Sequence, residues 1–390
     1  MQSNSALRDV INERIIESPQ KRITFAQYME LALYHPDYGY YSTQAVSIGK
    51  EGDFFTSVHL GADFGELLAG QFVQMWEILN QPETFSIVEM GAGQGLLALD
   101  ILGYLKIQYP DFFAALDYVV VEKSPGLKNE QQKRLQDFSV RWCDLEDIPD
   151  NSITGCFFSN ELVDALPINR FILQQGQLQE IYVAENPSST VPYFVEVIDT
   201  PSAAVKEYFD LVGIKFDITI YPDEYRSEVN LAALQWQTAI ACKLQKAYVL
   251  TIDYGYPAHR YYNPIRKQGT LQCYYQHRRH DNPYINVGMQ DITAHVDFTA
   301  LERWGEKCGL SKIAFTQQGL FLMALGLGSR IAAISYKQQA MQSLLLQRDS
   351  LHQLLDPMGL GGFGVLLQCK GLTTEELSQG LKGLTTPAMF

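Results

Sequence analysis

Short apolar runs alternate with helical segments from residue 85 onward, and this alternation restricts the possible folds more than any other feature. The predicted strands cover residues 85–90, 118–121, 139–142, 155–159 and 248–252. Predicted helices separate the first of these strands, at about Leu96–Gln108 and Pro125–Gln136. Strands that are apolar along their whole length and alternate with helices are typical of a parallel sheet covered on both faces. The sequence therefore predicts an α/β fold.

The same patterns divide the chain into regions: an N-terminal helical region with a long aromatic loop (1–80), the core of the sheet (81–167 and 247–325), an insertion of hairpins plus a helix (168–246), and a C-terminal helical extension (326–390). Helices are predicted over Ser5–Ile16 and Phe64–Leu79 from their amphipathic spacing. Within the insertion, Gln175-Gly176 is typical of a hairpin turn. We expect Lys312–Phe315 and Leu320–Met323 to form a hairpin that closes the sheet.

The net charge and the cysteine pattern indicate which classes of partner and which cellular compartment suit this protein. Thirty Lys and Arg against 44 Asp and Glu give a net charge of −14, which disfavours a nucleic-acid partner and suits a cationic substrate. The six cysteines contain no C-x-x-C pair and indicate reduced thiols. Charged residues interrupt the N-terminus, and the apolar run Leu320–Leu327 is too short to cross a bilayer. We expect a cytoplasmic protein that does not insert into a membrane.

The strongest chemical signal is the turn Glu89-Met90-Gly91-Ala92-Gly93-Gln94-Gly95 between the first strand and helix of the sheet. Its glycines allow a ligand to approach the backbone, and the helix N-terminus favours anionic groups. The G-x-G-x-G spacing differs from the G-x-G-x-x-G of nicotinamide binders. Glu122 ends the next strand, where an acid can bind ribose, and Asp144 follows the third, near an expected adenine. Such a turn can serve packing alone, but three acids at successive strand ends favour a nucleoside-containing cofactor.

These residues resemble the cofactor site of class I S-adenosylmethionine-dependent methyltransferases. Other segments resemble the MidA-like family, whose mitochondrial members are arginine methyltransferases needed for respiratory complex I assembly. The similar segments, in the family's order, are Gly52-Asp53-Phe54-Phe55-Thr56-Ser57, Ser159–Pro167, Ile252-Asp253-Tyr254-Gly255, Gly269-Thr270-Leu271 and Asp291–Phe298. One departure follows the first segment, where Val58-His59-Leu60 replaces the family's Pro-Glu and Ile or Val.

The resemblance implies a Rossmann-like, seven-stranded, mostly parallel sheet with helical extensions at both ends and an inserted substrate-binding segment. It implies S-adenosyl-L-methionine as cofactor and no metal. The implied cofactor-binding residues are Glu89, Gly91, Ala92, Gly93, Gly95, Glu122, Asp144, Asn160, Asp53 and Thr56. The implied reaction is methyl transfer to an arginine of a partner protein of the respiratory complex I type. Two alternatives are an assembly chaperone that binds the cofactor without essential turnover and a small-molecule methyltransferase.

Three acids are the catalytic candidates. Glu161 and Asp164 follow the fourth strand, and at i, i+3 they would share one face of a helical turn. Two carboxylates can hold a guanidinium in bidentate geometry, and the resemblance implies this role. Alternatively, they cap the start of a helix, where acids are favoured. Asp297 could orient the guanidinium or cap the helix after it. Asp253, at the end of the fifth strand, has a comparable ambiguity.

Two further segments have no assigned role. Residues 277–280, His-Arg-Arg-His, form the only compact basic run. Its two histidines have a spacing that could suit a metal, but no third ligand is near in sequence and the arginines would repel a cation. The aromatic run Tyr38-Gly39-Tyr40-Tyr41 and the Gly52–Ser57 loop could close over the cofactor as a lid, or pack the N-terminal helices onto the sheet.

Overall fold

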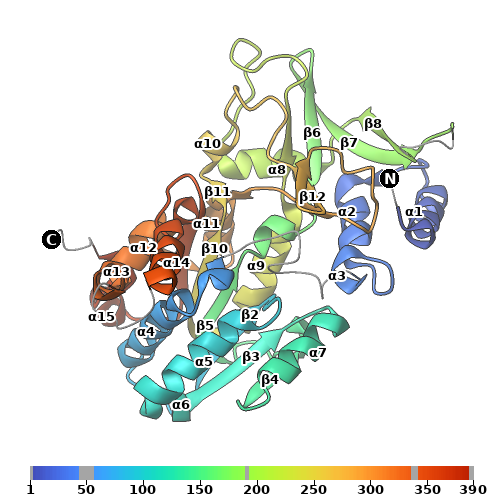
Figure 1. Ribbon diagram of the computed structural model, residues 1–390. Coiled ribbons are helices and arrows are strands. Elements are labelled where there is room, and N and C mark those ends of the chain that lie inside the picture. Colours follow the sequence, from blue (N-terminus) through green and yellow to red (C-terminus); the bar gives the residue numbers. More distant parts are fainter. Residues whose placement is uncertain (1–2, 44–56, 189–192, 335–340, 386–390) are drawn as a thin grey trace.

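A seven-stranded sheet forms the centre of the computed structural model, which describes residues 3–43, 57–188, 193–334 and 341–385 (Figure 1). Its strands, in spatial order, are β16 (Ser311–Gln317), β17 (Gly364–Lys370), β10 (Leu244–Asp253), β5 (Ile153–Asn160), β2 (Phe85–Met90), β3 (Leu116–Val121) and β4 (Val140–Cys143). The five strands from β10 to β4 are parallel, and β17 runs antiparallel to both of its neighbours. The predicted α/β fold with a seven-stranded, mostly parallel sheet is confirmed.

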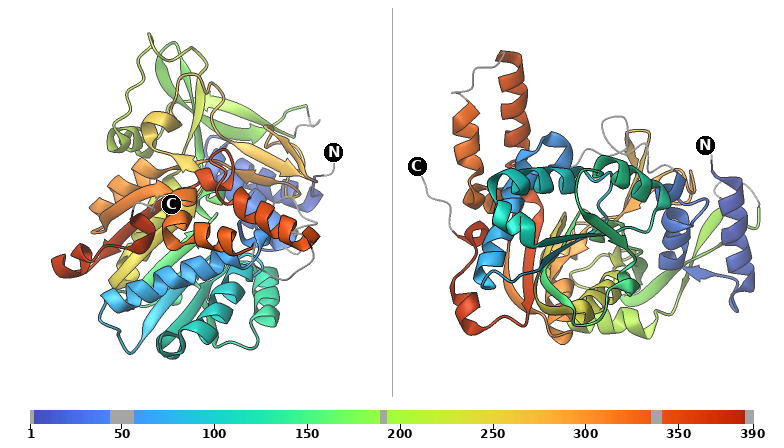
Figure 2. Two further views of the ribbon diagram at one scale, coloured as in Figure 1. Left: turned by 60° about the vertical axis from the view of Figure 1, so that its left-hand side comes forward. Right: turned by 90° about the horizontal axis from the view of Figure 1, so that it is seen from below.

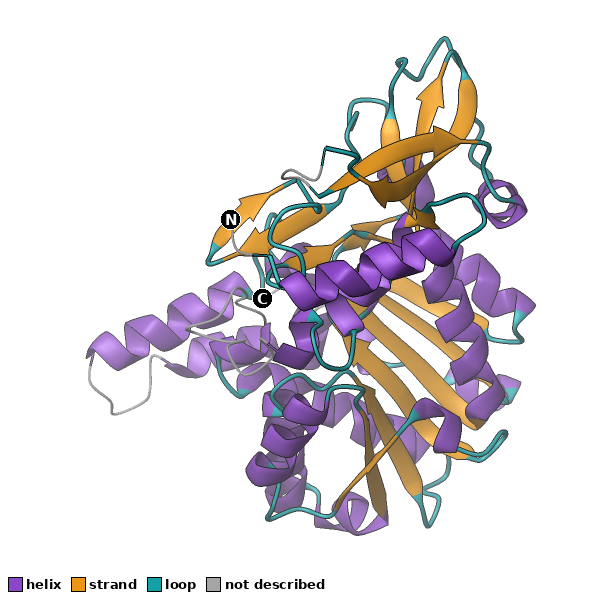
Figure 3. Ribbon diagram, turned by 90° about the vertical axis from the view of Figure 1, so that its right-hand side faces the viewer, coloured by secondary structure: helices purple, strands orange, loops and turns teal. Residues whose placement is uncertain are grey.

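Helices cover both faces of this sheet (Figure 3). Apolar residues of α4 (Asp63–Ile78), α5 (Leu96–Gln108) and α12 (Gln318–Leu325) pack on one face, where they share a core with Phe85 and Ile87 of β2. Val88 and Met90, which point to the opposite face, pack with α9 (Leu231–Lys243). The remaining helices of the core are α6 (Pro110–Ala115), α7 (Pro125–Arg134) and α11 (Phe298–Lys307), with short 3₁₀ turns η3 (Leu145–Asp147) and η4 (Val163–Ala165).

The predicted closing hairpin is wrong in its second half. β16 forms as expected, but Gln318–Leu325 is helix α12, and the strand that pairs with β16 is β17 from the C-terminal region. A short, continuous apolar run fits a strand and a buried helix equally well by periodicity. In the structure its buried residues include Phe321, Leu322 and Leu325, which lie on one helical face. The C-terminal region therefore supplies a strand of the core sheet and is not a helical extension alone.

The other C-terminal elements are helical: α13 (Leu327–Ile334), α14 (Met341–Gln353), α15 (Thr374–Ser378) and the 3₁₀ turns η5 (Leu360–Gly362) and η6 (Lys382–Leu384). Figure 2 shows that α13 and α14 lie at the opposite end of the molecule from the N-terminal helices. None of the helices within the described ranges is both long enough and apolar enough to cross a membrane.

The insertion lies between β5 and β10, as predicted, and forms most of a second sheet. Its elements are β6 (Asn169–Gln174), β7 (Gln177–Glu185), β8 (Phe194–Asp199), α8 (Ala203–Val212) and β9 (Arg226–Val229), followed by α9. Gln175 and Gly176 both have positive φ and form the two-residue turn between β6 and β7. The N-terminal strand β1 (Ile23–Thr24) pairs with β7 and so joins this sheet.

Smaller elements lie between the two sheets. The N-terminal region supplies α1 (Ser5–Glu17), α2 (Phe25–Tyr34), α3 (Tyr40–Thr43) and the turn η2 (Ser57–Leu60). The segment after β10 supplies β11 (Gly255–Tyr256), α10 (Ala258–Tyr261), β12 (Gln272–Tyr275), β13 (Arg278–His280), β14 (Asp291–Thr293) and β15 (Val296–Asp297). The side chains of α2 and β14 share a core with β12. These pieces are positioned over the carboxyl ends of the parallel strands, where ligands bind in open α/β sheets.

Candidate active site

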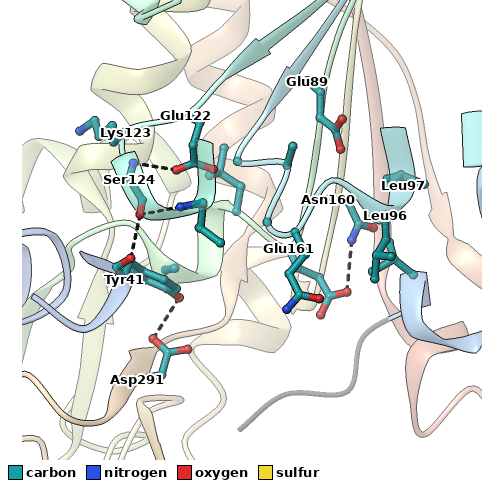
Figure 4. Close-up of a pocket in the computed structure, with 18 of the residues that line it drawn as sticks. Tyr41, Glu89, Leu96, Leu97, Glu122, Lys123, Ser124, Asn160, Glu161 and Asp291 are labelled. Carbon is teal, nitrogen blue, oxygen red and sulfur yellow. Dashed lines mark hydrogen bonds between the residues drawn. The ribbon is translucent and has the colours of Figure 1, made fainter. Parts of the chain in front are cut away.

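A cavity of about 420 Å³ opens at the carboxyl ends of β2, β3, β5 and β10 (Figure 4). This volume lies within the range of small-molecule and cofactor sites. Eight of the predicted site residues line it: Glu89, Gly91, Ala92, Gly93, Glu122, Asn160, Glu161 and Asp164. Gly95, Asp144 and Asp297 do not line it. Asp53 and Thr56 lie outside the described residues, so their predicted contacts stay predictions.

The backbone of the glycine-rich turn forms part of the cavity wall. Gly93 has a φ of 52°, and a Cβ added to it would meet no atom within 4 Å. The positive φ favours glycine, and the open space on that side is where a ligand can approach the main chain. Gly95 instead ends the turn as the residue before α5, with a φ of 76°, and packs against Gln131. It precedes the first residue of the helix and does not line the cavity.

Glu122 is held in place by two donors. Its Oε1 accepts a hydrogen bond from the backbone N–H of Ser124 (2.9 Å), and its Oε2 accepts one from Nε2 of Gln131 (3.0 Å). Gln131 also donates to the carbonyl oxygen of Gly93 (2.7 Å), so one side chain links Glu122 to the glycine turn. Burial raises the pKa of Glu122, and these hydrogen bonds partly oppose the rise. Gln131 could not be recognised from the sequence, since its spacing from Glu122 matches no known motif.

Glu89 and Asp144 differ in their surroundings. Glu89 is buried at the end of β2 and accepts a hydrogen bond from the Tyr118 hydroxyl (2.7 Å). Burial raises the pKa of Glu89 to about 7. Asp144, by contrast, is exposed, and its backbone N–H donates to Asp147 at the start of η3. Asp144 therefore lies outside the cavity wall, and its predicted contact with a cofactor stays a prediction.

Glu161 and Asp164 lie on a loop that several hydrogen bonds hold in place. The prediction that they share one face of a helical turn is wrong. Glu161 has a φ of 51°, and only Val163–Ala165 forms a 3₁₀ turn. A left-handed residue other than glycine costs about 1–2 kcal/mol, so the surrounding contacts must maintain it. The N–H of Glu161 donates to the carbonyl oxygen of Ile252 (2.9 Å).

Asp253 supplies most of this anchoring. It is fully buried at the end of β10, and its Oδ2 accepts hydrogen bonds from the N–H groups of Val163 (2.9 Å) and Asp164 (3.2 Å). The carbonyl oxygen of Asp164 accepts from the N–H of Ala294 (2.9 Å). Burial, followed by the charges of Asp164 and Glu161, raises the pKa of Asp253. Asp253 is therefore a positioning residue for the acid pair.

The two acids form an electrostatic site for a cation. Burial and then the charge of Asp164 raise the pKa of Glu161 to about 8, and burial raises that of Asp164 to about 6. Asp164 accepts a short hydrogen bond from the Tyr254 hydroxyl through Oδ2, while its Oδ1 has no partner within the described part of the chain. Asp164 is only 5% exposed, so its carboxyl group is not presented to solvent. A buried carboxylate needs a compensating partner.

Five further residues complete the wall: Tyr34, Tyr41, Ser124, Tyr254 and Asp291. None was among the predicted site residues, although Tyr41 belongs to the aromatic run considered as a lid. The Tyr41 hydroxyl donates to Oδ1 of Asp291 (3.0 Å), and the carbonyl oxygen of Tyr41 accepts from the Ser124 hydroxyl (2.9 Å), as Figure 4 shows. The Tyr34 ring stacks on that of Tyr41 at 5.3 Å. Tyr254 and Asp291 belong to segments that carried the family resemblance, which was the available signal. The N-terminal aromatic run therefore bridges the Glu122 side and the acid side of the cavity.

Asp297 has a structural role, so its place among the catalytic candidates is wrong. Its Oδ1 accepts hydrogen bonds from the N–H groups of Thr299 (3.0 Å) and Ala300 (3.3 Å), which makes it the N-cap of α11. Its Oδ2 accepts from the Tyr208 hydroxyl (3.1 Å). Burial raises the pKa of Asp297 to about 7. The residue stabilises a helix that covers the sheet and does not face the cavity.

Comparison with known families decides the class of enzyme. The family model described as "Putative S-adenosyl-L-methionine-dependent methyltransferase" matches residues 67–316, well over half of the chain. The chain belongs to this methyltransferase family. It is 28% identical to the "Protein arginine methyltransferase NDUFAF7 homolog, mitochondrial" of Drosophila melanogaster, over 87% of this chain and 79% of that protein. It is also 28% identical to human "Protein arginine methyltransferase NDUFAF7, mitochondrial", over 87% of this chain and 78% of that protein.

A solved structure supports the same assignment. A protein from Burkholderia thailandensis, crystallised with bound S-adenosyl-homocysteine, superposes with a TM-score of 0.83 at 29% identity, over 97% of this chain and 95% of that chain. The cavity of this methyltransferase fits S-adenosyl-L-methionine: the space beside Gly93 is open, and Glu122 lies where ribose hydroxyls can be bound. The recognised family, the fold and the cofactor are thus confirmed, while the role of each lining residue remains a prediction.

Removal of the Glu122 carboxylate should weaken cofactor binding. We expect Glu122→Ala to lower the affinity for S-adenosyl-L-methionine about ten- to hundredfold, because hydrogen bonds to a charged acceptor contribute roughly 1.5–3 kcal/mol. Titration calorimetry measures the change, with Glu83→Ala, an exposed acid just before β2, as the matched control. An unchanged affinity in Glu122→Ala would remove this residue from the cofactor site.

Filling the space beside Gly93 should exclude the cofactor. We expect Gly93→Val to abolish measurable binding of S-adenosyl-L-methionine, since the side chain would enter open space and the residue has a positive φ. Gly103→Val is the control, because Gly103 also has free space around its Cβ position but lies within α5. Circular dichroism distinguishes a blocked site from an unfolded chain. Wild-type binding by a folded Gly93→Val variant would contradict this placement.

Proposed function

We propose that this methyltransferase transfers a methyl group to an arginine side chain of a protein. The observation that carries the proposal is the pair of carboxyl groups, Glu161 and Asp164, that face the cavity in a site suited to a cation. Among the described residues that line the cavity, Lys123 is the only lysine or arginine, and it lies on the Glu122 side. The relatives named as protein arginine methyltransferases support the same substrate class.

The acid pair would hold and polarise the guanidinium. When bound, S-adenosyl-L-methionine supplies an electrophilic methyl group on its sulfonium sulfur. Glu161 and Asp164 would each accept N–H donors of the guanidinium, which fixes one nitrogen at attack distance. Tyr254 keeps Asp164 oriented through its hydroxyl, and Asp253 holds the loop. The guanidinium loses a proton as the new C–N bond forms, and a carboxylate whose pKa lies near neutrality can accept it.

The finer proposal is that the substrate is a newly made subunit of a respiratory complex of the complex I type, modified in the cytoplasm before assembly buries the arginine. Its support is the family resemblance of the sequence segments. A lysine substrate is disfavoured, since paired carboxylates would keep its ammonium protonated and unable to attack. Nucleic acid is disfavoured by the net charge of −14.

One experiment tests the proposed substrate class. The enzyme is incubated with radiolabelled cofactor and a lysate of cells that lack this gene, and the labelled material is hydrolysed. Label recovered as methylarginine supports the proposal. Label confined to lysine, nucleic acid or a small molecule contradicts it, and binding of the cofactor with no label transferred to anything would favour the chaperone alternative.

A further inference from the structure

A hairpin with exposed arginines lies beside the acidic cavity. β12 and β13 are joined by Gln276 and His277, whose φ angles of 49° and 62° suit a two-residue hairpin turn. Arg278 and Arg279 of β13 are exposed, and neither forms an ion pair with another described residue. In the described part of the chain, β13 pairs with β12 alone. Among the described strands none pairs with its outer edge, and such an edge can in general pair with an extended segment.

The register of this sheet places Arg279 on the cavity side. Tyr274 of β12 lies opposite Arg279 on β13 and opposite Asp291 on β14. Residues directly opposite each other in an antiparallel sheet project to the same face, and Asp291 lines the cavity. Because neighbouring strands lie about 4.8 Å apart, the backbone of Arg279 is roughly 10 Å from that of Asp291. The backbone of Arg279 is thus two strands away from that of Asp291, which lines the cavity.

Two more arginines extend the positive charge along the same side. The guanidinium carbons of Arg266 and Arg260 lie 4.6 Å and 5.6 Å from the centre of the Tyr256 ring. The Tyr256 ring contacts His295 at 5.3 Å, and His295 contacts Tyr254 of the cavity wall at 5.1 Å. A continuous row of rings therefore leads from the acidic cavity to these arginines.

His295 lies within the electrostatic field of both arginine groups. Burial first, then the charges of Arg266 and Arg279, lower the pKa of His295 to about 4. The imidazole therefore feels the positive charge of both Arg266 and Arg279. We name the three residues Arg260, Arg266 and Arg279 the basic rim; Arg278, the strand neighbour of Arg279, projects to the other face.

We propose that the basic rim binds carboxylate side chains in the protein segment that flanks the target arginine, an inference that rests on the proposed function. Charge complementarity supports it: a chain of net charge −14 repels an acidic segment elsewhere, whereas guanidinium groups pair with carboxylates in bidentate geometry. The open edge of β13 can hold such a segment through main-chain hydrogen bonds. A span of roughly 10 Å corresponds to about three extended residues.

The first test maps the methylated sites. Lysate of cells that lack the gene is treated with enzyme and labelled cofactor, and methylarginine sites are located by mass spectrometry. We expect Asp or Glu about three residues from the modified arginine. Methylarginine in segments without nearby acids overturns the role of the basic rim and leaves the proposed function intact. Absence of methylarginine contradicts the proposed function, and the inference fails with it.

The second test reverses the charge of the rim. A peptide with the sequence of a mapped site is compared with versions that carry Gln or Lys in place of the flanking acid. For the acidic peptide, we expect Arg279→Glu to lower kcat/KM about tenfold relative to wild type, and to shift preference toward the Lys version. Lys206→Glu, an exposed charge reversal on α8, should keep the wild-type preference.

Two further readouts separate docking from a structural defect. Affinity of Arg279→Glu for S-adenosyl-homocysteine should equal that of wild type, because the rim lies outside the cofactor cavity. The preference of the wild type for the acidic peptide should shrink in 0.5 M salt, since exposed charges are screened. An equal preference for all three peptides in the wild type, or an unchanged preference in Arg279→Glu, overturns the proposal.

Discussion

Glu161→Gln is expected to reduce methyl transfer to protein by about a thousandfold while leaving cofactor affinity nearly unchanged. The amide has the shape of the carboxyl group but lacks the negative charge that would hold a guanidinium and stabilise the charge shift in the transition state. Loss of one such preorganised interaction costs about 10²–10³ in rate, and here the neutral amide would also turn an N–H group toward the cation. Single-turnover transfer of labelled methyl measures the rate, and calorimetry measures cofactor binding.

Controls for this variant follow from the structure. Glu146→Gln changes an exposed acid in the turn after β4 and should retain wild-type activity. Asp253→Asn should also lower the rate, because the carboxylate accepts from Val163 and Asp164 through Oδ2 and from the N–H of Tyr254 through Oδ1, and an amide would turn its NH₂ group toward one of these donors. If Glu161→Gln loses the cofactor as well as activity, Glu161 belongs to the cofactor side of the cavity rather than to the substrate side.

The sequence predicted the parts of the fold that depend on local pattern. Strand β2 and helix α5 have the predicted bounds, because a continuous apolar run, a glycine turn and a longer apolar segment each determine structure over a few residues. The order of β17 between β10 and β16 could not be predicted in this way. β17 comes from a segment more than a hundred residues after β10, and its place depends on long-range pairing.

The predicted acids differ in whether they line the cavity. Glu122 and Asp164 point into the cavity, whereas Asp144 and Asp297 lie at the starts of turns or helices. Capping competes with ligand binding for the same residue types, and local sequence cannot decide between the two. The contact between Tyr41 and Asp291 joins residues 250 positions apart, so only the fold reveals it.

Activity should rise steeply with pH, whereas the free energy of unfolding should fall. The acid pair can hold a guanidinium only when ionised, and the pKa values of Glu161 and Asp164 are raised to about 8 and about 6. Between pH 6 and 8 we therefore expect kcat/KM to rise about tenfold per pH unit, as Glu161 loses its proton. In Glu161→Gln, the residual activity should lose this slope. A flat wild-type profile would mean that both acids are already ionised before the substrate binds.

The free energy of unfolding changes with pH in the opposite direction to the activity, because the folded state binds these protons more tightly than the unfolded state. The ordinary pKa of Glu161 is 4.5 and its folded value is about 8, so between these values the folded protein binds more protons. The free energy of unfolding must then fall as pH rises through this window. We expect the Tm of the free enzyme to decrease by a few degrees from pH 6 to pH 8, and Glu161→Gln to be more stable than wild type at pH 8 by about 1–3 kcal/mol. Calorimetric unfolding of both proteins across this range measures the difference, and a Glu161→Gln variant that is less stable at pH 8 would show that the carboxylate is already compensated within the protein.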